Sequence, residues 1–160
     1  MARLDRMSQA ERDAILAIPC PTFPSTPWQP ARPLADCRVA IVSTAGLHLR
    51  DDRPFALTAG GPGGLPGDYR VIPTDSPARE LVMSHVSVNF DRSGWQRDWN
   101  LVLPLDRLRE LAAAGAIGSV AAYHYSFMGA APPDQLEAPA RRLARLLAGD
   151  GVDLALLVPV

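Results

Sequence analysis

Polar and aromatic side chains gather in three short segments of the chain, each of which follows or ends an apolar run. The segments are residues 44–51, 84–85 and 124–129, and together they contain all 3 histidines. In an open sheet of parallel strands, the loops after the strands meet at one edge, where ligands bind. Side chains from these loops would converge there on a small anionic substrate, whose carboxylate Arg50 could bind with two hydrogen bonds.

Each of these residues also has a structural explanation. A lone histidine at a strand end, such as His85, is more often a hydrogen-bonded structural residue than a catalytic one. Arg50 and Asp51 are equally compatible with a solvated surface. Three polar segments in one small domain favour a functional site without deciding it.

The spacing of the candidate ligands argues against a metal site. The chain has no His-x-His, His-x3-His or Cys-x2-Cys pair, so no metal is expected. Ser126 lies in no Gly-x-Ser-x-Gly elbow, which excludes that nucleophile motif. The glycine-rich residues 60–67 lack the Lys-Ser/Thr pair of a phosphate loop and predict a flexible connector.

The regular elements that must position these segments follow from the apolar pattern. Residues 1–18 have helical spacing with Ser8 and Glu11 as a capping box, and the prolines of residues 19–33 predict an extended arm. Strands are expected at residues 38–44, 69–73, 81–86, 100–104 and 153–160. Helices are expected at residues 105–115, opened by Pro104, and at 134–147, ended by Gly149.

The last predicted strand is an uninterrupted apolar run that reads as a central strand buried on both faces. The prediction is therefore a single α/β domain with a short, mostly parallel sheet and flanking helices in three layers, incomplete at its C-terminus. Residues 1–35 form an N-terminal helix and a proline-rich arm, and residues 36–160 form the domain proper.

Composition narrows the function classes. The formal net charge is -1, which gives no reason to expect a nucleic acid or an anionic membrane as partner. All 16 basic residues are arginines, which excludes functions that need a Schiff-base lysine or a phosphate-loop lysine. Residues 1–18 carry several charges and resemble no signal peptide or membrane span, so a cytoplasmic location is expected. Cys20 and Cys37 read as ordinary thiols of a reducing compartment.

Five stretches in this order resemble the glycine/sarcosine/betaine and D-proline reductase selenoprotein B family. The resemblance covers residues from about 39 to 160. It rests on residues 42–51 (VSTAGLHLRD), 67–73 (GDYRVIP), 97–100 (RDWN) with 104–111 (PLDRLREL), 124–129 (HYSFMG) and 151–160 (GVDLALLVPV). One departure is residues 87–94 (SVNFDRSG), where family members often have an Asp/His-rich stretch.

The resemblance implies a reductase subunit that acts on an amino acid or amine. In that family a selenolate or thiolate attacks the α-carbon and displaces the nitrogen, and thiols supply the electrons. The family's closing strand leads into the redox motif, so a selenocysteine is expected immediately after Val160, at a UGA codon read as a stop; no other cofactor is expected in this chain. A catalytically silent substrate-binding or scaffolding subunit is the alternative, and an unrelated small-molecule-binding α/β domain is a second one.

The same resemblance suggests roles for the polar segments. His48, His85 and His124 are candidates for proton handling. The candidates for substrate binding are Thr44, Gly46, Arg50, Tyr125 and Ser126. The expected partners are a small amino acid or amine and a partner reductase subunit such as the pyruvoyl-containing one, with assembly into a homo-oligomer left open.

Overall fold

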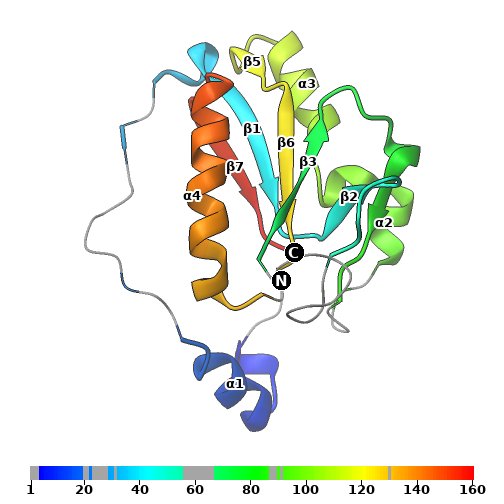
Figure 1. The fold of residues 1–160 in the computed structure, drawn as a ribbon, viewed down its shortest axis with the longest axis vertical. Helices are drawn as coiled ribbons and strands as arrows, with labels where there is room; N and C mark the ends of the chain where they lie inside the picture. Colours follow the sequence, from blue (N-terminus) through cyan, green and yellow to red (C-terminus); the bar gives the residue numbers. More distant parts are fainter. Residues whose placement is uncertain are drawn as a thin grey trace.

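The fold is a short sheet covered by helices on both faces (Figure 1). The computed structural model describes residues 4–19, 22, 29–30, 32–55, 67–86, 90, 92–129 and 131–160. Strand β1 (Arg38–Ser43) lies in the middle and pairs in parallel with β5 (Ser119–Val120), β6 (Tyr123–Phe127) and β7 (Leu154–Val158). Strand β3 (Tyr69–Pro73) pairs antiparallel with β6. The predicted α/β class with a mostly parallel sheet is confirmed.

The register places β5 and β6 one after the other along the same side of β1. Arg38 and Val39 pair with β5, and Val42 and Ser43 pair with β6. β7 pairs with β1 from Val39 to Ser43, on the other side. The apolar residues at 39 to 42 make β1 the strand that a sheet buries on both faces.

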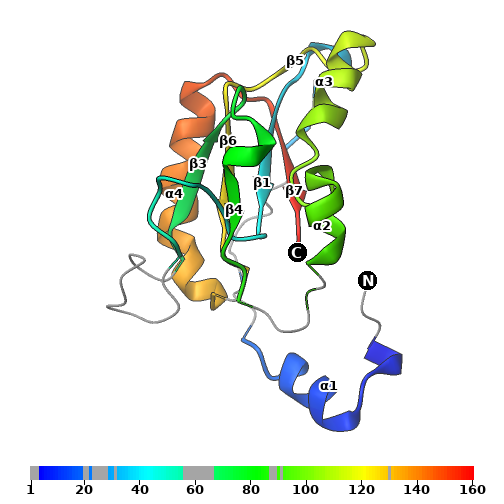
Figure 2. The same cartoon turned by 90° about the vertical axis from the view of Figure 1, so that its right-hand side faces the viewer.

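Three layers are visible when the sheet is seen edge-on (Figure 2). Helix α4 (Pro133–Gly149) covers one face, where Leu143 packs with Tyr125 and Phe127. Helices α2 (Ser93–Arg97) and α3 (Leu105–Ala113) cover the other face, where the core includes Ile41 and Leu105. The predicted helices at 105–115 and 134–147 are thereby confirmed.

A second, two-stranded sheet lies beyond the carboxyl end of β1. Strand β2 (Leu47–Leu49) pairs antiparallel with β4 (Leu81–Met83), which the 3-10 helix η3 (Ala78–Glu80) precedes. The chain reaches β2 from β1 through Thr44, Ala45 and Gly46. This small sheet carries two of the predicted polar segments to the end of the main sheet.

The N-terminal elements are short. The 3-10 helix η1 (Leu4–Arg6) precedes α1 (Gln9–Leu16), and η2 (Leu34–Asp36) leads into β1. The predicted capping box is confirmed, because the Ser8 hydroxyl accepts the Glu11 N–H and the Glu11 carboxylate accepts the Ser8 N–H. Most of the proline-rich arm at 19–33, and residues 60–66 of the glycine-rich connector, lie outside the described residues.

Helix α4 contains an internal proline at a point of close contact with the sheet. Pro139 is buried and lacks the N–H that would bond to the carbonyl of Gln135. Gly67, at φ +84°, lies against that carbonyl so closely that a Cβ atom would be 2.4 Å from the Gln135 oxygen. The start of β3 therefore meets α4 where the helix lacks one of its own hydrogen bonds.

Two sequence predictions about strands are wrong. Residues 100–104 do not form a strand, because Trp99–Leu101 form the 3-10 helix η4. The Asp98 carboxylate caps the start of this helix by accepting the Asn100 N–H. The strand at 153–160 is present as β7, but it lies at the margin of the described sheet, and Leu157 is 69% exposed. An apolar run alone does not distinguish a central strand from a marginal one.

None of the described helices is both long enough and apolar enough to cross a lipid bilayer.

Candidate functional site

Thr44 joins the carboxyl ends of β1 and β7. Its backbone N–H donates to the Val158 carbonyl at 3.1 Å, and its hydroxyl oxygen accepts the Val160 N–H at 2.8 Å. Its carbonyl accepts the Gly129 N–H at 3.0 Å. Because Gly129 follows β6, this one residue holds the outgoing ends of three parallel strands together.

Gly46 brings the second polar segment to the same edge. It has φ +66°, donates its N–H to the Phe127 carbonyl at 2.8 Å and accepts the Ser84 N–H at 2.9 Å. A Cβ atom at this position would lie 2.7 Å from Met128 Cε and 3.2 Å from the His85 nitrogen. A glycine is required here by the positive φ and by the close approach of the His85 backbone, which follows β4.

His48 and Ser84 form a hydrogen-bonded pair across the small sheet. The Nε2 atom of His48 lies 2.8 Å from the Ser84 hydroxyl, and Nδ1 lies 2.7 Å from the Leu49 carbonyl. A carbonyl can only accept, so Nδ1 carries a proton, and in the neutral ring Nε2 accepts the hydroxyl proton of Ser84. His48 is 3% exposed and packs edge-on against Phe55, whereas Ser84 is half-buried.

His85 lies directly after Ser84 and is buried at the same edge. It is 4% exposed, it packs edge-on against Phe90, and its Nδ1 atom has no hydrogen-bond partner among the described residues. Burial lowers the pKa of His85 and the charge of Arg92 adds to this, whereas hydrogen bonding to the backbone of Thr44 and Ala45 opposes it. The site therefore holds a neutral imidazole with one unused nitrogen.

His124 occupies a different part of the molecule. It points into the interior of the main sheet, where Nδ1 accepts the Ile41 N–H at 3.0 Å and Nε2 lies 3.0 Å from the Thr74 hydroxyl. The Thr74 hydroxyl in turn donates to the Ala121 carbonyl. Burial, with the charge of Arg109, lowers the pKa of His124 to about 4, so the ring is neutral and both nitrogens have partners.

Of the other predicted binding residues, Arg50 and Tyr125 lie away from the edge, whereas Ser126, which pairs with Ser43 at the end of β1, lies at the edge but is buried. Arg50 is exposed at the far end of β2, where it donates to the Arg79 carbonyl at 3.1 Å. Tyr125 is 2% exposed and packs against Tyr69 beneath α4. Ser126 is fully buried and its hydroxyl accepts the Leu47 N–H at 2.9 Å, which supports the start of β2.

Thus the structure brings together Thr44, Gly46, His85 and the Ser84–His48 pair. In the part of the chain that the structure describes, no group of three or more His, Cys, Asp or Glu residues could hold a metal ion. The pairing of Ser84 with His48 is not readable from the sequence, because it depends on the antiparallel register of β2 and β4. The only local signal is the alternation of residues 47–49 (Leu-His-Leu).

The profile of the family described as glycine/sarcosine/betaine reductase selenoprotein B matches residues 4–159. The chain belongs to this family. The match extends the resemblance expected from residue 39 back to the N-terminal helix.

Two relatives of this selenoprotein B family member are informative. D-proline reductase subunit gamma of Acetoanaerobium sticklandii is 33% identical over 142 residues, which are 86% of this chain and 54% of that protein. Sarcosine reductase complex component B subunit beta of Peptoclostridium acidaminophilum is 33% identical over 114 residues, which are 69% of this chain and 25% of that protein. The chain thus spans about half and a quarter of the length of these relatives. No solved structure matches it.

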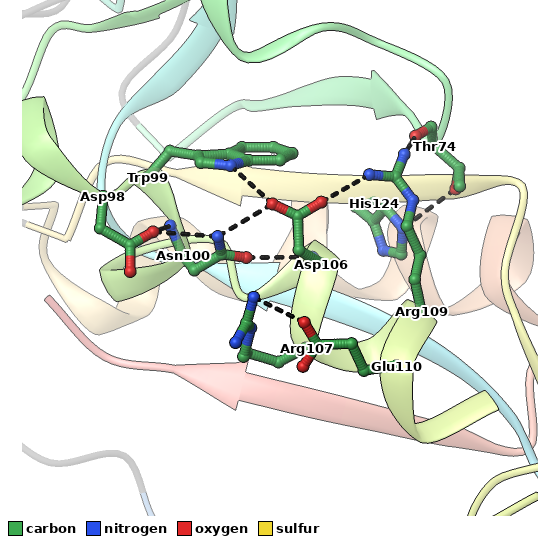
Figure 3. Close-up of polar contacts among 9 residues, drawn as sticks. All are labelled: Thr74, Asp98, Trp99, Asn100, Asp106, Arg107, Arg109, Glu110 and His124. Carbon is green, nitrogen blue, oxygen red and sulfur yellow. Dashed lines mark hydrogen bonds and ion pairs between the residues drawn. The ribbon is translucent and has the colours of Figure 1, made fainter. Parts of the chain in front are cut away.

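Within residues 97–100 and 104–111, which carry part of the resemblance, one hydrogen-bonded unit forms in this selenoprotein B family member (Figure 3). It consists of Asp98, Trp99, Asn100, Asp106 and Arg109. The Asp106 carboxylate accepts Trp99 Nε1–H at 2.9 Å, Asn100 Nδ2–H at 3.0 Å and an Arg109 N–H at 2.8 Å. These bonds, that from Asn100 first, lower the pKa of Asp106 against the opposing effect of burial. Arg109 also donates to the Thr74 carbonyl, which links this unit to His124. The bonds of this unit join α3 to η4 and, through Arg109, to Thr74 at the end of β3.

Proposed function

We propose that this chain is part of a reductase-complex subunit that cleaves a carbon–nitrogen bond of an amino acid or amine. The relatives named D-proline reductase subunit gamma and sarcosine reductase complex component B support the reaction class. The observation that carries the proposal is the junction at Thr44, where the outgoing ends of β1, β6 and β7 meet. Such a junction is where an open α/β sheet binds its ligand.

The nucleophile of this reaction is proposed to lie outside the described residues. Cys37 precedes β1 at the end opposite to Thr44, about 20 Å away along the strand. It is 1% exposed, and its Sγ lies 3.5 Å from the Pro33 carbonyl. A buried thiol of this kind behaves as a core residue rather than as a nucleophile.

A selenocysteine or cysteine after β7 in the complete protein would fit the edge. The Thr44 hydroxyl accepts the Val160 N–H. The His85 ring interacts with the backbone of Thr44, and its Nδ1 atom has no hydrogen-bond partner among the described residues. Such a residue would supply a chalcogenolate that bonds to the substrate α-carbon as the C–N bond breaks and the nitrogen leaves as an amine. Attack of a thiolate on the chalcogen would then break its bond to the carbon, which would take up a proton. A second thiol would release the chalcogenolate as a disulfide forms, and this oxidation of two thiols would supply the two electrons of the reduction.

Within this chain, His85 is the proposed proton-handling residue at the junction. Its ring is neutral and buried, and one nitrogen is unpartnered among the described residues, so it can accept or donate a proton beside an incoming thiol or selenol. Thr44 and Gly46 are proposed to shape the site through their backbone, because both already use their polar groups to join strand ends.

The test begins with the nucleotide sequence that follows the codon of Val160. An in-frame continuation with selenocysteine or cysteine is expected; an unrelated continuation would contradict the proposal. The full-length protein is then incubated with its copurifying subunits, a dithiol and each of D-proline, sarcosine, glycine and betaine. Ring opening of D-proline or release of the amine from another substrate is expected, and it should vanish in a variant with serine at the chalcogen position. Binding of substrate without turnover would instead identify a silent binding subunit.

A further inference from the structure

Arg92 is an exposed arginine whose guanidinium is held next to the strand junction. It immediately precedes α2, and its side chain reaches back to donate a hydrogen bond to the carbonyl of His85. His85 is buried, whereas Arg92 is exposed to solvent. One side of the guanidinium is therefore fixed by the protein, while the residue as a whole stays open to a ligand.

A short series of contacts leads from this arginine to the end of β7. The charge of Arg92 helps to lower the pKa of His85, and the His85 ring interacts with the backbone of Thr44. The Thr44 hydroxyl in turn accepts the Val160 N–H at 2.8 Å. Phe90 and Val160 pack against the same core cluster, and Figure 2 shows the C-terminus next to α2. The guanidinium thus lies near the place where the proposed nucleophile would follow β7.

The guanidinium of Arg92 can accommodate an anionic ligand. Among the described residues, its side chain bonds only to the His85 carbonyl, although a guanidinium carries several N–H donors. No carboxylate of the described residues forms an ion pair with it, in contrast to Arg109, which pairs with Asp106 at 2.8 Å. The neutral ring of His85 adds no charge of its own. Such an arginine is suited to bind a carboxylate through two parallel hydrogen bonds.

We propose that Arg92 is a substrate-binding residue that holds the carboxylate of an amino acid, so that the substrate is an amino acid with a free carboxylate rather than a simple amine. This proposal rests on the proposed reductase function. D-proline and sarcosine, which appear in the names of the relatives, both carry such a carboxylate. Because the carboxylate is bonded to the α-carbon, a fixed guanidinium also sets the position of that carbon. Arg92 takes the role that the sequence suggested for Arg50, which lies at the far end of β2.

The kinetic test uses the full-length protein with its copurifying subunits and whichever of D-proline, sarcosine, glycine and betaine it turns over. Arg92→Gln is expected to raise KM about 10- to 100-fold, the effect of losing a charge-assisted hydrogen bond, with kcat changed less than about threefold. Arg92→Lys keeps the charge without the planar fork and should raise KM less. Arg97→Gln, at the other end of α2, should leave both constants unchanged.

Two small inhibitors separate carboxylate binding from a structural role. Acetate carries the carboxylate without the nitrogen, so it should inhibit the unmodified protein competitively, and Arg92→Gln should weaken this inhibition by the same factor as it raises KM. Methylamine carries the nitrogen without the carboxylate, and its effect should be the same in both proteins.

Three results would overturn the role of Arg92. They are an unchanged KM in Arg92→Gln, no inhibition of the unmodified protein by acetate, and equal weakening of acetate and methylamine, which would indicate a displaced His85 segment. An unmodified protein that turns over none of the four substrates would refute the reductase function instead.

Discussion

The Nδ1 atom of His124 accepts the backbone N–H of Ile41 at 3.0 Å, in the interior of the main sheet. Along this side of β1, Val39 is bonded to the segment that follows β5, and Val42 is the first residue paired with β6. The imidazole takes the place of a strand partner in the gap between them. A buried N–H without a partner would cost about 1–3 kcal/mol, so His124 completes the sheet.

We expect this histidine to make stability fall with acid. Its pKa is lowered from 6.5 to about 4 in the folded chain, so the unfolded chain binds more protons between these values. The stabilisation that neutral His124 provides should therefore be fully present above about pH 6.5. The free energy of unfolding should decrease by about 2 kcal/mol between pH 7 and pH 5. Urea titrations at both pH values measure this. His124→Gln should be less stable at pH 7 and lose most of the pH dependence; an unchanged dependence would contradict the assignment.

Thr74 should matter through its hydroxyl. It lies 3.0 Å from Nε2 of His124, and Thr74→Val keeps the shape while leaving that N–H without an acceptor. A loss of about 1–3 kcal/mol is expected from chemical denaturation. Thr74→Ser retains the hydroxyl and should cost less than about 1 kcal/mol. Equal losses in the two variants would show that the methyl group, rather than the hydrogen bond, is what stabilises the fold.

Gly46 and Gly115 offer a matched comparison of two left-handed glycines. Both have positive φ, +66° and +70°, but only Gly46 has close neighbours, whereas a Cβ atom at Gly115 meets nothing within 4 Å. Gly115→Ala should cost about 1–2 kcal/mol, the conformational penalty alone. Gly46→Ala should cost about 2–4 kcal/mol, because the backbone of His85 must also move. Thermal unfolding of both variants measures the difference, and similar losses would argue against a tight strand junction.

The Asp106 side chain should contribute more to the free energy of unfolding than the side chain of its exposed neighbour Glu110. Asp106 accepts bonds from Trp99, Asn100 and Arg109, whereas Glu110 forms an exposed ion pair with Arg107. Asp106→Ala is expected to lower the free energy of unfolding by about 2 kcal/mol, and Glu110→Ala by less than about 0.5 kcal/mol. Trp99 fluorescence should change only in the first variant. Equal effects would mean that the unit does not anchor α3.

The parts of the fold that sequence could predict are those specified by local chemistry. The Ser8–Glu11 capping box, the proline before α3 and the apolar run of β1 act within a few residues of themselves. The parts it missed depend on distant partners. The polar residues of β6 suggest a loop when only the sequence is considered. The groups that bond to His124 inside the sheet, the Ile41 N–H and the Thr74 hydroxyl, lie far away in the sequence. Likewise, the exposure of Leu157 depends on which strands lie beside β7.

The candidate site was predictable only in outline for the same reason. The expectation that three polar segments meet at one edge holds for Thr44, Gly46 and His85, whose positions follow from strand ends. It does not hold for His124 and Tyr125, because both are inside β6 rather than after it. Alternation along that strand then sends the two side chains to opposite faces of the sheet.

The contact between Gly67 and the Gln135 carbonyl beside Pro139 makes two distant positions interdependent. Any side chain at 67 would push α4 outward and separate Leu136 and Leu143 from the aromatic rings beneath them. Replacing Pro139 would restore a helical bond that draws the same carbonyl back toward the helix axis. The distance between α4 and the sheet therefore depends on the hydrogen bond that Pro139 removes and on the side chain that Gly67 lacks. Neither residue can be replaced without affecting the contact made by the other.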